Sequence, residues 1–184
     1  MVFRPLPALV LLTLGLATAC RSKPSEPDVA QLLDQLKSSD DQVSGKATLQ
    51  LIRLGEPAAG ALGVMLADAD PLTRETAART LWGMGARGKA AAPALGTALS
   101  DPEVTVRVAA AMALENMGPA AEAAIPALVK ALRDRDGQVR QWAVRALGSI
   151  GPAASAAIPA LEAASKTDAV HQPAEEAILK IRGQ

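Results

Sequence analysis

Residues 124–152 read AIPALVKALRDRDGQVRQWAVRALGSIGP and contain the unit from which most of the chain is built. Apolar residues return every three to four positions over 126–132 and again over 139–150, which is the spacing of two helical faces. The polar residues 134–137 between them favour a turn, and Gly151 with Pro152 ends the second helix. This segment is therefore predicted to form a helical hairpin.

The hairpin recurs along the chain with a period of 33 residues. Proline stands at positions 93, 126 and 159, inside the segments AAPAL, AIPAL and AIPAL, and the frame extends back to residues 60–62. Repetition at this period is typical of a solenoid of stacked units. Further columns that keep the same step are Asp68, Asp101 and Asp134; Asp70, Glu103 and Asp136; Arg74, Arg107 and Arg140; Leu81, Leu114 and Leu147; and Gly85, Gly118 and Gly151.

Several residues mark the expected ends of helices. Asp70 and Asp101 each stand directly before a proline, the arrangement of a side-chain cap followed by proline at the first helical position. The recurring glycine column favours left-handed caps at the ends of the second helices. The recurring prolines fall inside the first helix of each unit, so we expect those helices to bend or to start late.

A first unit ending at Leu54 and a last unit with a turn shortened by two residues bring the total to five hairpins over residues 28–184. The predicted fold class is all-α, a right-handed α-solenoid of about five helical hairpins. The pattern Asp-x-Asp-x-x-Val-Arg-x-x-Ala-x-x-Ala-Leu-x-x-Ile-Gly-Pro at 134–152 resembles the short HEAT repeats of the class named after phycobilisome lyases. This resemblance covers roughly residues 28–184. It implies that second helices line the concave face.

The first 20 residues, MVFRPLPALVLLTLGLATAC, are predicted to address the chain to the cell envelope. The apolar stretch over 6–19 is shorter than the roughly 20 residues that a spanning helix needs, so residues 1–19 read as a cleaved signal peptide. Residues 16–20 resemble a bacterial lipobox, which implies lipidation of Cys20 and a periplasmic, membrane-anchored protein. Ala17-Thr18-Ala19 also fits ordinary secretory cleavage, which would leave a free thiol and a secreted protein. The polar residues 20–27 read as the lipidated cysteine and a flexible tether.

Composition excludes several classes of function. The chain has 19 Lys and Arg against 19 Asp and Glu, so no net charge attracts it to nucleic acid. One Cys and one His rule out thiolate clusters and multi-histidine sites, so neither a metal nor a cofactor is expected. His171 is expected to be a solvated loop residue. No phosphate-binding loop or nucleophile motif is present, and we predict no catalytic residue and no enzyme activity.

The recurring acidic and basic columns are the most conspicuous polar pattern. Carboxylates and guanidinium groups in register can support acid–base or phosphate chemistry. A residue that recurs once per repeat is instead expected to have a structural role in each unit. The resemblance to HEAT arrays implies that these residues form a ladder that joins the turns of adjacent units. The predicted ladder comprises Asp68, Asp101, Asp134, Arg74, Arg107 and Arg140.

The outward face of the second helices is the candidate recognition surface. Helical rotation of 100° per residue places on it ten residues of mixed character, namely Leu49, Ile52, Glu75, Arg79, Trp82, Val108, Met112, Glu115, Gln141 and Arg145. Large apolar groups beside charges are typical of protein-binding patches, which predicts a non-catalytic scaffold for a protein or peptide.

Three alternatives to this interpretation remain open. One is an enzyme or enzyme-accessory protein, lyase-like, with a small ligand in a closed pocket near Glu75, Arg79 and Arg145. Another is a passive structural element. The third is that Trp82 and Met112 pack between units, as is expected of Trp142.

Overall fold

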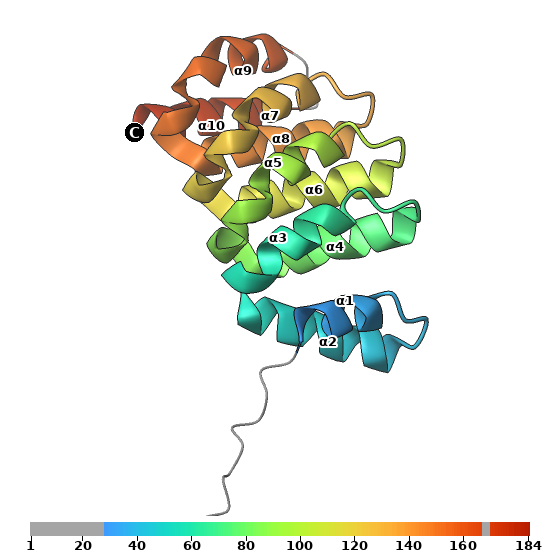
Figure 1. The fold of residues 1–184 in the computed structure, drawn as a ribbon. Coiled ribbons are helices and arrows are strands. Elements are labelled where there is room, and N and C mark those ends of the chain that lie inside the picture. Colours follow the sequence, from blue (N-terminus) through green and yellow to red (C-terminus); the bar gives the residue numbers. More distant parts are fainter. Residues whose placement is uncertain (1–27, 167–169) are drawn as a thin grey trace, which may run out of the picture.

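The computed structural model describes residues 28–166 and 170–184, and these form five stacked helical hairpins (Figure 1). The signal peptide, Cys20 and tether predicted above lie outside the described residues. The hairpins pair α1 (Val29–Leu36) with α2 (Asp41–Leu54), α3 (Glu56–Met65) with α4 (Pro71–Met84), α5 (Ala92–Ala98) with α6 (Val104–Met117), α7 (Ile125–Ala131) with α8 (Gly137–Ile150), and α9 (Ile158–Ala164) with α10 (His171–Arg182). The predicted all-α solenoid of five hairpins is confirmed.

The hairpins stack in chain order, so that first helices form one layer and second helices the other (Figure 1). The loops inside the first four hairpins all lie on the same side of the stack (Figure 1). No helix in the described ranges is both long enough and apolar enough to cross a membrane.

Aspartates fix where most second helices begin. The carboxylates of Asp40, Asp70 and Asp136 accept hydrogen bonds from backbone amides in the first turns of α2, α4 and α8. The predicted cap at Asp101 is wrong, because α6 begins at Val104 with Glu103 in the capping position. Asp101 shares the column of Asp68 and Asp134, and its carboxylate bonds the amide of Glu103 and a neighbouring arginine instead.

Glycines Gly85, Gly118 and Gly151 end the second helices with φ of 54°, 57° and 77°. Their ψ values of −136°, −133° and −144° lie outside the left-handed helical region, so the predicted cap type is wrong, although a positive φ still favours glycine. After each glycine the chain turns back as a 3₁₀ helix, η1 (Gly85–Ala91), η2 (Gly118–Ala124) or η3 (Gly151–Ala157).

The prolines of the repeat stand in the first turns of α5, α7 and α9. At that position the missing backbone N–H breaks no helical bond. Of the two outcomes expected from the sequence, a bend or a late start, the structure shows the late start, since each α-helix begins only after the 3₁₀ helix.

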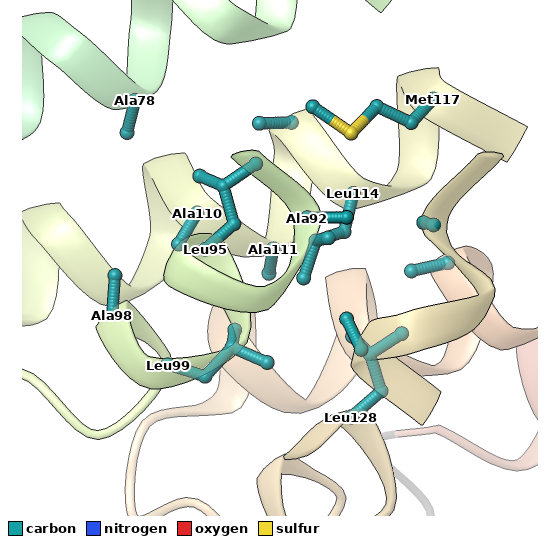
Figure 2. Packing of buried hydrophobic residues seen from close by; sticks show 14 of the residues in the cluster. Ala78, Ala92, Leu95, Ala98, Leu99, Ala110, Ala111, Leu114, Met117 and Leu128 are labelled. Carbon is teal, nitrogen blue, oxygen red and sulfur yellow. The ribbon is translucent and has the colours of Figure 1, made fainter. Parts of the chain in front are cut away.

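Leucine and alanine build a core that is continuous along the stack. Leu51, Leu81, Leu114 and Leu147 of the second helices are fully buried, and the first helices bury a matching leucine column. Figure 2 shows Leu95 of α5 and Leu114 of α6 close to Ala92, Ala110 and Ala111, with Leu128 of α7 further along the stack. Small alanines let the helices approach closely, so the units hold their register by packing.

Candidate functional site

Two arginines join neighbouring units through bidentate ion pairs. Arg74 Nε and Nη2 donate to the Asp101 carboxylate at 2.7 and 2.9 Å. One unit further, Arg107 Nε and Nη2 donate to Asp134 at 2.9 and 3.1 Å. Each Nη1 group also donates to two backbone carbonyls of its own loop, those of residues 68 and 69 for Arg74 and of 101 and 102 for Arg107.

The two ends of this ladder differ from its middle. Lys37 Nζ donates to Asp68 at 2.7 Å, in place of an arginine. At the other end, Arg140 Nη1 donates to the carbonyls of Asp134 and Arg135. The six predicted ladder residues thus lie along the seam of the loops, where their hydrogen bonds join neighbouring units and where they also line three open hollows between the units.

Electrostatics fit a structural role for the carboxylate of Asp101. Burial alone would raise its pKa, but hydrogen bonds from Arg74 and from the Glu103 amide, with the positive charge of Arg74, together lower the pKa below its usual value. The carboxylate therefore stays ionised near neutral pH, as a salt-bridge acceptor requires.

The ten candidate recognition residues all lie in the layer of second helices but differ in exposure. Trp82 is 46% exposed and Leu49 is 59% exposed, and Arg79, Gln141 and Arg145 are also exposed. The half-buried members are Ile52, Glu75, Val108, Met112 and Glu115.

Four of these candidates meet in one groove between α2, α4 and α6, with a volume of about 440 Å³. They are Ile52, Arg79, Trp82 and Met112, and residues that the sequence analysis did not single out complete the lining, namely Thr48, Thr76, Thr80, Gly83 and Ala109. Trp82 and Met112 therefore border an open groove and are not sealed between units. We call this the Trp82 groove.

The three threonine hydroxyls that line the Trp82 groove are already used within their own helices. The hydroxyls of Thr48, Thr76 and Thr80 donate to the carbonyls four residues earlier in their own helices, at 2.8–2.9 Å. A Cβ at Gly83 would lie 2.5 Å from Ile52 Cδ1, so a larger residue there would displace the Ile52 side chain that lines the groove. An apolar side chain is therefore the ligand group that this groove suits best.

The charged candidates do not converge on one pocket. Arg79 Nε donates to Glu75 Oε1 at 2.8 Å, within α4. Arg145 lies over the ring of Trp142, 4.7 Å from its centroid, and lines a separate groove of about 260 Å³ with Glu115. Trp142 is half-buried and packs against the core. Glu75, Arg79 and Arg145 therefore do not gather in one pocket, although Arg145 and Glu115 share their groove with Glu176 and Lys180.

Metal-binding groups do not gather in the part of the chain that the structure describes. No set of three His, Cys, Asp or Glu residues there could hold a metal ion. His171 is exposed at the start of α10, with Nδ1 2.7 Å from the carbonyl oxygen of Ser165 and Nε2 3.6 Å from Glu175.

A family model described as HEAT repeats matches residues 92–181. No curated protein matches the chain. Among solved structures, the complex of CpcE and CpcF of phycocyanin lyase from Nostoc sp. PCC7120 is similar, with a TM-score of 0.64 and 21% identity over 81% of this chain and 96% of that one.

Two engineered proteins are also similar to this chain, each with a TM-score of 0.60 over 84% of it. One is 24% identical and is covered over 79% of its length, and the other is 25% identical and is covered over 47%. At this level of identity the likeness supports the HEAT-type solenoid fold, and the function must be argued from the surface.

Proposed function

We propose that this protein is a non-catalytic scaffold that binds a protein or peptide in the Trp82 groove, on the face expected to be concave. The observation that carries the proposal is the large apolar side chain of Trp82, left half-exposed beside a groove whose threonine hydroxyls are already hydrogen-bonded. Tryptophan is enriched among residues that dominate binding energy, and a buried anchor from a partner would complete its packing.

The proposal extends to an anchor in the bacterial cell envelope. The sequence supports it through the apolar stretch of residues 6–19, the lipobox-like residues before Cys20, and the polar tether after it. The lipid would supply location and the HEAT-type units would supply recognition. The protein would then contact the membrane only through the N-terminal lipid. The proposal includes no nucleic-acid partner and no metal.

A lyase-like enzyme or accessory role is the alternative to a scaffold. It calls for polar groups around a small ligand, and Glu75 and Arg79 bond one another while Arg145 lies over Trp142. The separation of these groups favours the scaffold.

The test is cross-linked capture of partners from native membranes with three forms of the protein. The double variant Trp82→Ala with Met112→Asp should lose at least one partner that the unaltered protein captures. Glu122→Ala, an exposed position on η2, is the matched control and should capture the same partners as the unaltered protein. Circular dichroism of the double variant must first show native helicity, because Met112 is half-buried. Identical partners for all three forms would refute binding in the Trp82 groove.

A further inference from the structure

A second surface lies along the edge formed by the hairpin loops, away from the Trp82 groove. Three hollows follow this edge in order. The first, between α3 and α5, has a volume of about 630 Å³, the second, between α5 and α7, about 370 Å³, and the third, between α7 and α9, about 640 Å³. Each hollow is lined partly by hairpin-loop residues. The edge therefore carries a row of hollows, which side chains of an extended segment could enter.

The chemistry of this edge changes from unit to unit at fixed positions of the repeat. The second unit has exposed Val64, Ala67 and Ala69, and the fourth unit has exposed Lys130, Arg133 and Arg135 in the same columns. The third unit has the neutral residues Thr97, Ser100 and Pro102 there. The ladder and leucine positions keep their residue type in these three middle units, so this change from apolar to basic belongs to the exposed surface.

The apolar end of the edge leaves two large side chains exposed among the residues that the structure describes. Val64 is 77% exposed and Leu72, at the start of α4, is 69% exposed. Ala67 and Ala69, which lie between them in the sequence, are exposed as well, and Ala67 lines the first hollow. Exposed apolar side chains that gather on one surface often mark a site of contact with another molecule.

The basic end carries positive charge that is available to a partner. The side chains of Lys130 and Arg133 form no ion pair with any residue in the described ranges, and Arg135 makes one long hydrogen bond, 3.4 Å, to the carbonyl of Pro102. The neighbouring carboxylates are already engaged, since Asp134 pairs with Arg107 and Asp136 caps α8. Lys130 and Arg133 also line the second and third hollows.

We propose that this edge binds an extended protein segment that is apolar at one end and acidic at the other. Stacked helices lie about 10 Å apart, so the second and fourth units are separated by roughly 20 Å, the span of about six extended residues. An anionic membrane or a nucleic acid fits less well, because exposed Asp40, Asp70 and Glu103 lie on the same edge and would repel phosphate. This site is independent of the Trp82 groove and would let one molecule hold two partners.

The test uses the mature protein and two labelled octapeptides of one composition, followed by fluorescence anisotropy. In the first peptide, Leu-Leu-Ala-Leu-Ser-Glu-Glu-Glu, apolar and acidic residues are separated, and in the second they alternate. The separated peptide should bind at least tenfold more tightly. Equal affinities for the two peptides would overturn the proposal.

Variants then locate the binding site. Arg133→Glu with Arg135→Glu should weaken binding of the separated peptide at least tenfold, and Val64→Ser with Leu72→Ser should also weaken it. Trp82→Ala should leave this binding unchanged, so failure of this proposal is distinguishable from failure of the Trp82 groove. Binding that survives both edge variants, or stronger binding to phosphatidylglycerol vesicles than to the peptide, contradicts the proposal. All substituted positions of the edge are exposed, and circular dichroism checks that each variant folds.

Discussion

Arg107 is only 4% exposed and is the one charged residue in the buried class among the described residues. Four of the five N–H groups of its guanidinium are hydrogen-bonded, two to Asp134 in the next unit and two to carbonyls of its own loop. A buried charge of this kind is tolerated because its hydrogen bonds and its ion pair with Asp134 offset the loss of hydration. Arg107 therefore joins two neighbouring loops, and its hydrogen bonds serve this structural contact.

Removing this side chain should be costly. Arg107→Ala leaves the Asp134 carboxylate without its charge partner and should lower the free energy of unfolding by about 3 kcal/mol, measured by urea denaturation. Arg79→Ala is the control, since that ion pair is exposed on one helix and should contribute less than about 0.5 kcal/mol. A loss for Arg107→Ala as small as the one expected for Arg79→Ala, under about 0.5 kcal/mol, would show that this ion pair does not stabilise the fold.

Asp101 should make stability depend on acid pH. Because its pKa is lowered in the folded state, its contribution is present above the unfolded value of about 3.9 and is lost as pH falls through the folded pKa. The melting temperature of the unaltered protein should therefore fall below about pH 4 more steeply than that of Asp101→Asn. Parallel melting curves of the two proteins from pH 7 to pH 3 would contradict this assignment.

At the scale of helices, two glycines illustrate different roles, one at a close contact between helices and one on an exposed helix surface. Gly148 of α8 is buried, and a Cβ there would lie 3.0 Å from both the Cα and the Cβ of Ala177 in α10. Gly45 of α2 is exposed, with no atom within 4 Å of the corresponding position. One glycine is required for two helices to approach, and the other only weakens its helix.

The two glycines should respond oppositely to alanine. Gly45→Ala should raise the free energy of unfolding by about 0.5–1 kcal/mol, through helix propensity alone. Gly148→Ala should lower it by about 1–3 kcal/mol, because α10 must move away from α8. Thermal and urea denaturation measure both changes. A stabilising effect at Gly148 would show that the close contact relaxes without cost.

The helical hairpins could be predicted from the sequence because period and apolar spacing are local signals. The start of α6 could not, since Asp101-Pro102 is a strong local start signal and the ion pair with Arg74 outweighs it. The threonines of the Trp82 groove were missed for a related reason. Their role depends on which helices meet, although Thr76 and Thr80, four residues apart, mark a shared helical face.

At the scale of the whole molecule, the repeat separates scaffold from surface. Positions that keep their residue type, such as the arginine and leucine columns, hold neighbouring units together. Other positions change from one unit to the next, as from Val64 to Thr97 to Lys130, so the exposed surface becomes more polar and basic along these three units. A solenoid built in this way can present different chemistry on its helix face and on its loop edge. The position of the membrane relative to these surfaces then depends on where the chain is anchored.

The anchor is predicted to lie at the first unit, through Cys20. Seven residues separate Cys20 from Asp28, a reach of about 20–25 Å when extended, so α1 would be held close to the membrane. Cys20→Ser should move the protein from the membrane fraction to the soluble fraction, while Ser22→Ala, two residues on, should leave it membrane-bound. Mass spectrometry of the mature N-terminus gives the independent readout, a diacylglyceryl-modified Cys20. An unmodified thiol at that terminus would instead indicate ordinary secretory cleavage after Ala19 and a secreted protein.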